Sequence, residues 1–200
     1  MKTFDSSTRA ALPGNLKVSR RMYARYFGDS PGEWLTRTVC CRLPWFMHRW
    51  PGVGTHLHHW TQMCEVLEHG CLNPAMVLDT RRGLVAAFTN LSNHERRPRP
   101  VIKIFEERLH LIAPPVGEGA RIAVASVYWR KGEDPRADWD DFSPIVTDCL
   151  ADGTQCRAAR ERIKPTAWAA LDAALAGMTQ RDELGLFTAT VPDAMVRAAF

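Results

Sequence analysis

The histidines are the residues best suited to metal chemistry, because all seven lie between positions 48 and 110. His56, His58 and His69 stand near Glu65 in a stretch with helical spacing. Imidazoles and a carboxylate on one helix face are ligands that zinc or nickel accepts. The stretch lacks an H-E-x-x-H pattern, so these side chains are interpreted as surface or capping residues. No cofactor is predicted, and a metal-dependent enzyme that uses these four residues remains an alternative.

Cysteines offer a second kind of chemistry. Cys64 and Cys71 are separated by six residues, and so are Cys149 and Cys156. Structural zinc sites usually place only about two to four residues between paired ligands. The cysteines, with the adjacent Cys40-Cys41, are therefore predicted to be free thiols that behave as small buried hydrophobic residues.

Sequence motifs of catalysis are missing. The chain has no G-x-S-x-G nucleophile elbow, no G-x-x-x-x-G-K-[ST] phosphate loop and no G-x-G-x-x-G dinucleotide motif. The sequence therefore favours a protein that acts without catalysis, although an enzyme is not excluded.

An acidic segment near position 140 is the first candidate for a binding surface. It contains Asp138, Trp139, Asp140 and Asp141. An aromatic anchor among carboxylates suits docking to a basic protein, because aromatic residues often dominate binding energy and charge steers the approach. The leading functional prediction is thus a bacterial cytosolic module that binds another protein, as an adaptor or an immunity-type inhibitor.

A basic segment near the N-terminus supports a different class of partner. Residues 1–50 carry nine basic and three acidic side chains, against a net charge of only +4 for the whole chain. Cations and stacking rings alternate in this segment, as single-stranded nucleic acid requires. The alternative prediction is nucleic-acid binding through Arg20, Arg21, Arg25, Tyr23 and Tyr26.

The elements that must position these residues form one predicted domain over residues 1–200. A chain of 200 residues that is 46% hydrophobic can bury a sizeable core without disulfides or metal. Residues 1–72 are predicted to be helical, 73–149 to form the sheet, and 150–200 to return to helix with a possible last strand. The expected fold class is α+β, with a mostly antiparallel sheet of five to six strands, arranged as a meander or a partly open small barrel and flanked by N-terminal and C-terminal helices.

Hydrophobic periodicity and the positions of glycine and proline give the expected bounds of each element. Helices are predicted over 19–27, 31–42, 58–69, 155–163 and 165–176. Strands are predicted over 75–79, 83–91, 101–105, 109–112, 121–129, 141–148 and 185–191. Trp60, Cys64, Leu67 and Cys71 are expected on the core face of one helix.

Neither a secretory signal nor a membrane span is recognisable in the sequence. Asp5 and the polar residues after it replace the apolar stretch of a signal peptide, and no apolar run approaches about 18 residues. We therefore expect a cytoplasmic protein with no membrane span.

Three hydrophobic strand patterns, at 73–90, 100–105 and 121–129, carry a resemblance. Over about residues 70–150 the chain resembles an uncharacterised bacterial family of domains of unknown function. The resemblance implies a bacterial, intracellular protein with a compact sheet core, and it transfers no catalytic residue.

Overall fold

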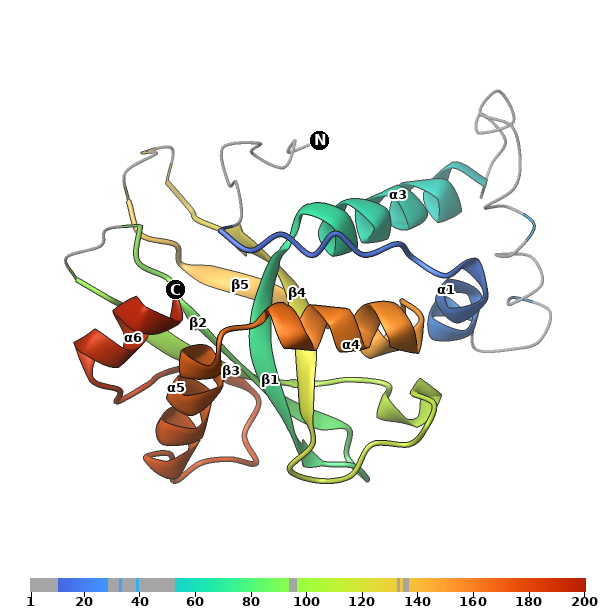
Figure 1. Cartoon of the computed structure of the whole chain (residues 1–200). Coiled ribbons are helices and arrows are strands. Elements are labelled where there is room, and N and C mark those ends of the chain that lie inside the picture. The colour runs from blue at the N-terminus through green and yellow to red at the C-terminus, as the bar shows by residue number, and fades with distance from the viewer. Residues whose placement is uncertain are drawn as a thin grey trace.

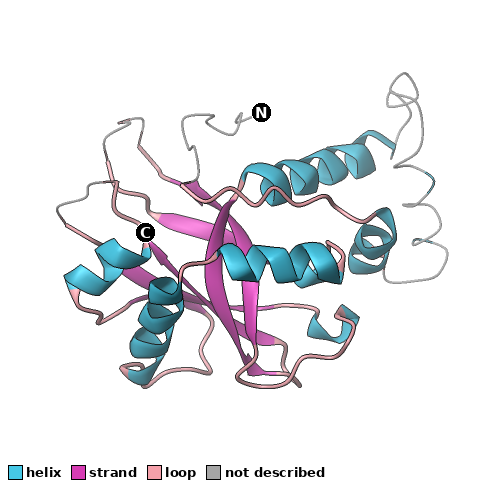
Figure 2. Ribbon diagram, in the orientation of Figure 1, coloured by secondary structure: helices cyan, strands magenta, loops and turns pink. Residues whose placement is uncertain are grey.

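The computed structural model describes residues 11–28, 33, 39, 53–93, 97–132, 134 and 137–200, with only the backbone of 53–57. Apart from positions 33 and 39, the helix predicted over 31–42 lies outside these residues, as do Cys40 and Cys41. The described part is a curled sheet with helices packed around it (Figures 1 and 2).

Two helices, α1 (Arg20–Phe27) and α3 (Val53–His69), pack together through aromatic rings. The ring centroids of Tyr23 and Trp60 lie 5.0 Å apart in an edge-to-face arrangement, which aromatic pairs favour. Both helices confirm predictions from the sequence, and α3 begins earlier than expected.

The chain changes from helix to strand at Gly70. Its N–H still bonds to Val66 O at 2.8 Å, whereas Cys71 already pairs with Ser126 of a neighbouring strand. The predicted helical core stripe is therefore wrong at Cys71, because strand pairing replaces the next helical turn. Leu67, on the same stripe, is fully buried as expected.

The described residues contain one six-stranded sheet. Its strands are β1 (Cys71–Asp79), β2 (Leu84–Asn90), β3 (Pro100–Glu106), β4 (Arg121–Trp129), β5 (Asp141–Val146) and β6 (Gly185–Thr188). Their order is β5-β4-β1-β2-β3-β6, and every neighbouring pair is antiparallel. β1 to β3 form a meander, and β4 returns to the free side of β1. The predicted α+β fold with an antiparallel sheet is confirmed.

β1 starts four residues before its predicted start, in spite of Pro74. In the register with β4, residues 73 and 75 direct their backbone groups toward β4, so the missing N–H of Pro74 lies on the β2 side. Pairing with β2 begins only at Ala75. The proline therefore leaves the ladder with β4 intact, and pairing with β2 starts beyond it.

The sheet curls into a half-barrel, which brings β3 and β5 together across three intervening strands. Lys103 Nζ in β3 lies 2.9 and 2.8 Å from the two carboxylate oxygens of Asp141 in β5, and it donates to Phe142 O at 2.7 Å. An ammonium has three N–H donors, and these three acceptors match them. We call this contact the Lys103 clasp. The partly open barrel is one of the two arrangements expected from the sequence.

Three helices cover the convex face of the sheet: α4 (Gly153–Arg162), α5 (Pro165–Ala176) and α6 (Asp193–Ala199) (Figure 1). The Phe200 ring, directly after α6, lies 5.7 Å from that of Phe88 in β2. Within the described residues, no helix is both long and apolar enough to cross a membrane.

Two short 3-10 helices replace predicted strand residues. η2 (Leu109–Leu111) occupies the strand predicted over 109–112, which is therefore wrong. The N–H groups of Leu111 and Ile112 bond back to the carbonyls of Arg108 and Leu109, so local turns satisfy the backbone without a neighbouring strand. η3 (Thr147–Cys149) likewise ends β5 earlier than predicted.

Candidate functional site

An open groove of about 520 Å³ lies between α4 and the loop that precedes β4. Apolar side chains of Ile112, Val116 and Ile122 line it, with two prolines of the loop. Its charged lining residues are Arg121, Asp148, Asp152, Arg157 and Arg160. An apolar wall beside a few charged groups is the usual composition of a ligand site.

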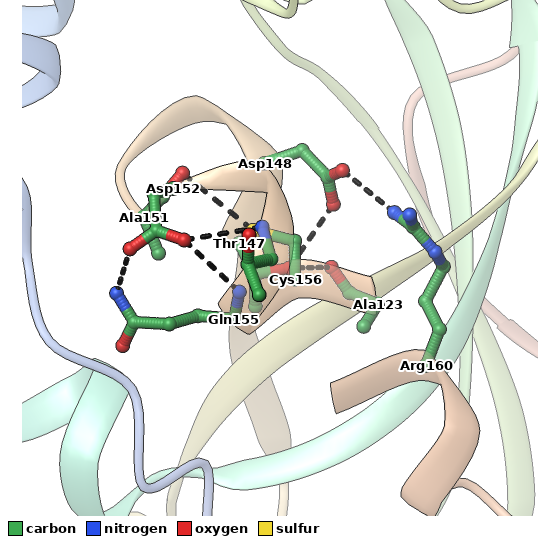
Figure 3. Close-up of polar contacts among 9 residues, drawn as sticks. Ala123, Thr147, Asp148, Ala151, Asp152, Gln155, Cys156 and Arg160 are labelled. Carbon is green, nitrogen blue, oxygen red and sulfur yellow. Dashed lines mark hydrogen bonds and ion pairs between the residues drawn. The ribbon is translucent and has the colours of Figure 1, made fainter. Parts of the chain in front are cut away.

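The start of α4 forms one end of the groove, and Asp152 organises it (Figure 3). The Asp152 carboxylate accepts the N–H groups of Thr154 and Gln155, each at 3.1 Å, and caps the helix. The side-chain amide of Gln155 donates to the same carboxylate and is the largest cause of the lowered pKa of Asp152. The Asp152 carboxylate therefore has its hydrogen-bond donors within the protein.

The second carboxylate of the groove is also occupied. Asp148 is paired with Arg160 at 2.6 Å, and its side chain is only 10% exposed (Figure 3). The single proton of the Thr147 hydroxyl is shared between the carbonyl of Ala123 at 3.0 Å and the Asp148 carboxylate at 3.2 Å, which fixes η3 to β4. Asp148 therefore neutralises Arg160 and holds the floor of the groove in place.

Two arginines of the groove remain exposed. Arg121 pairs with Asp172 at the surface and lies 5.5 Å over the Trp168 ring. Arg157 makes no hydrogen bond or ion pair with another described residue and is exposed. Because exposed ion pairs contribute little, both cations can attract an anionic ligand.

The described thiols are not activated as nucleophiles. Burial raises the pKa of Cys156 to about 12 and raises that of Cys149 further. Burial also raises the pKa values of Cys64 and Cys71. A thiolate is the reactive form, so none of these four thiols is activated. Cys149 and Cys156 are buried, as the sequence predicted, whereas Cys64 and Cys71 are half-buried.

The four residues of the predicted docking rim lie together before and at the start of β5, and all have internal partners. Asp138 accepts the N–H of Asn93 at 2.8 Å, and Asp140 accepts that of Lys131 at 2.7 Å. Asp141 belongs to the Lys103 clasp, and Trp139 lies under the Arg130 guanidinium at 4.6 Å. These contacts anchor the loop, and a docking role for it stays a prediction.

All five residues of the predicted nucleic-acid site lie on α1, but they differ in exposure. Arg20, Arg21 and Arg25 are exposed. Tyr23 is buried, and the hydroxyl of Tyr26 bonds to the Glu107 carboxyl. Tyr26 itself is half-buried, and nucleic-acid binding through these residues stays a prediction.

The predicted metal ligands lie on α3. His58, Glu65 and His69 are exposed, and the side chain of His56 lies outside the described residues. Among the described side chains, no group of three or more His, Cys, Asp or Glu residues could hold a metal ion. The histidine site stays a prediction.

A buried polar cluster lies inside the curl of the sheet. Tyr128 OH accepts the Asn73 amide at 2.9 Å and lies 2.6 Å from the Thr89 hydroxyl, which donates to Asn73. These bonds join β1, β2 and β4. The nearby Ser126 hydroxyl is buried without a hydrogen-bond partner.

Sequence reasoning missed the groove, because its walls are far apart along the chain. The pair of prolines near 114 was recognised only as a helix break, and α4 only as a helix. The one local signal was the cap sequence Asp152-Gly153-Thr154, which begins a helix that has arginines on it.

Comparisons with known proteins show the family and no function. The chain is similar over 58% of its length to a solved structure described as "a putative membrane protein from Corynebacterium diphtheriae", at 21% identity and a TM-score of 0.44, with 98% of that chain covered. No curated protein matches the chain. A family model described as "Protein of unknown function (DUF3239)" matches residues 58–178, which include β1 to β5 and all the residues that line the groove. This confirms the resemblance found in the sequence, and the chain belongs to the DUF3239 family.

Proposed function

We propose that this protein is a non-catalytic binding module, which takes an acidic and partly apolar segment of another protein into the groove beside α4. The observation that carries the proposal is an apolar wall next to two exposed arginines. An adaptor or an immunity-type inhibitor is the role that this chemistry suits.

The charges of the groove favour an acidic segment over a basic one. Both of its carboxylates are engaged, Asp148 with Arg160 and Asp152 with the first turn of α4. Three arginines, Arg121, Arg157 and Arg160, nevertheless stand against these two carboxylates in the lining, so the groove carries a net positive charge. Such complementarity raises the association rate and fixes the orientation of the bound segment.

The size of the groove fits a short extended segment. A volume of about 520 Å³ lies within the usual range of ligand sites. Pro114, Pro115 and Val116 offer apolar contact on the loop side, opposite Arg157 of α4. A segment with an acidic residue beside an apolar one would use both walls.

We also propose that the protein works in a reducing compartment such as the bacterial cytoplasm. Cys64, Cys71, Cys149 and Cys156 are all free thiols, and free buried thiols suit such a compartment.

Peptide selection against the full chain tests the proposal. Peptides that bind from a random library are expected to combine Asp or Glu with an apolar residue. In fluorescence anisotropy, Arg157→Glu should weaken their binding about tenfold, because it places a negative charge in the groove. Lys131→Glu is the matched control, since Lys131 is equally exposed but lies beyond the opposite end of β4.

Two outcomes contradict the proposal. One is the selection of basic peptides, which would instead direct attention to Asp138 and Asp140. The other is equal affinity of the Arg157→Glu and Lys131→Glu variants, which would place the bound peptide outside the groove.

A further inference from the structure

The sheet ends on one side at β6, whose outer backbone groups are unpaired within the described residues. The Ala189 N–H donates to Pro100 O at 2.9 Å, so residues 185, 187 and 189 direct their backbone toward β3. Alternate residues of an antiparallel strand face opposite sides. The N–H and C=O groups of Leu186 and Thr188 therefore point away from the sheet.

Apolar side chains accompany this open backbone. Leu184, directly before β6, is 54% exposed and is one of few large apolar residues with such exposure in the described chain. Leu186 and Phe187 are half-buried. Exposed apolar surface beside unpaired backbone is typical of an edge that accepts another strand.

We propose that β6 joins a second copy of this chain by antiparallel strand addition across a twofold axis at Phe187. In this register Leu186 of one copy lies opposite Thr188 of the other, and the same pair repeats on the other side of the axis. Both residues direct their backbone outward, so each pair exchanges two hydrogen bonds.

The sequence of β6 explains why a second copy fits. Its four residues, Gly-Leu-Phe-Thr, carry no charge, so two copies of the strand do not repel each other. The twofold arrangement is self-complementary, as a closed dimer requires. The interface is separate from the groove beside α4, so it does not depend on the proposed function.

The oligomeric state of the full chain tests this inference. Sedimentation velocity should show a monomer–dimer equilibrium, with dimer present at protein concentrations on the order of 100 µM, because so short a strand buries a small interface. Leu186→Pro removes only an outward N–H, and Leu184→Lys adds a charge to the edge. Both variants should stay monomeric at this concentration. Ala158→Lys, at an exposed position of α4, should dimerise like the natural sequence.

A monomeric natural chain at the highest concentration overturns the inference, and so does a dimer that both edge variants retain. Hydrogen exchange provides a test that needs no variant. Exchange of the Leu186 and Thr188 amides should slow as protein concentration rises. Protection that does not change with concentration would instead mean that this chain, or another kind of partner, covers the edge.

Discussion

The two outer strands of the sheet, β5 and β6, differ in whether their outward backbone groups have hydrogen-bond partners. In the register with β4, residues 142, 144 and 146 of β5 direct their backbone outward. Two of these positions are blocked: Phe142 donates to Asp141 at 2.7 Å and accepts from Lys103, and Pro144 has no N–H. On β6, the corresponding groups of Leu186 and Thr188 have no partner among the described residues.

This difference shows that the polar residues beside β5 have a structural task. Edge strands recruit other strands unless a proline, a charge or a covering segment blocks them. At β5 the blocking groups are the clasp lysine, the Asp141 carboxylate and a proline. Lys103 and Asp141 therefore have a structural role that needs no ligand. The groove beside α4 and the open edge of β6 remain as candidates for binding.

Removing the clasp is expected to have the largest effect. Lys103→Met leaves the Asp141 carboxylate, 22% exposed, without its cation and frees Phe142 O. Urea denaturation should show a loss of about 2–3 kcal/mol in the free energy of unfolding. Asp172→Ala breaks the exposed pair with Arg121 and should cost at most about 0.5 kcal/mol. Equal losses in the two variants would show that the clasp does not hold the curl.

Glu107, directly after β3, gives the stability of the protein a dependence on pH. Burial raises the pKa of Glu107 above its ordinary value of 4.5, although it accepts the Arg108 N–H at 2.7 Å. The folded chain then binds more protons than the unfolded chain, so the free energy of unfolding falls as pH rises from 4.5 to the folded pKa.

Glu107→Gln lacks this titration. Relative to the variant, the natural protein should lose up to about 1 kcal/mol per pH unit within that window and nothing above it. Urea denaturation at a series of pH values measures the difference. Parallel stability curves would mean that Glu107 ionises as easily in the folded chain as in the unfolded one.

Restoring one N–H to β5 is expected to change stability least. Pro144→Val keeps the ladder with β4, because the new N–H points outward, so the free energy of unfolding should stay within about 0.5 kcal/mol. The variant should nevertheless self-associate more than the natural chain in light scattering, since β5 then resembles β6. Ile145→Val, whose backbone faces β4, is the control. Equal scattering from both variants would show that the clasp alone protects this edge.

Much of the fold could be predicted because its signals are local. α5 has the predicted bounds, since Pro165 begins it and Gly177 follows it, and β4 matches its alternating pattern. The error at 109–112 has a local cause as well. A short apolar run fits a strand or a turn, and only the absence of a neighbouring strand decides between them.

The candidate site could not be predicted in the same way. Asp138 to Asp141 were correctly recognised as a cluster, but their partners Asn93 and Lys103 are 45 and 38 residues distant in sequence. No periodicity relates residues so far apart. Whether a carboxylate anchors a loop or faces a partner depends on what the fold places beside it.

The sequence by itself determined most strands and helices of the described residues, with the error at 109–112, and it shows the lack of the common catalytic motifs. Hydrophobic period and capping act within a few residues, so they can be recognised without the fold. Only the tertiary structure decided that Lys103 reaches β5, that Arg157 faces an apolar wall and that β6 keeps an open edge. Each of these depends on the path of the chain through space, which brings distant residues into contact and leaves others exposed.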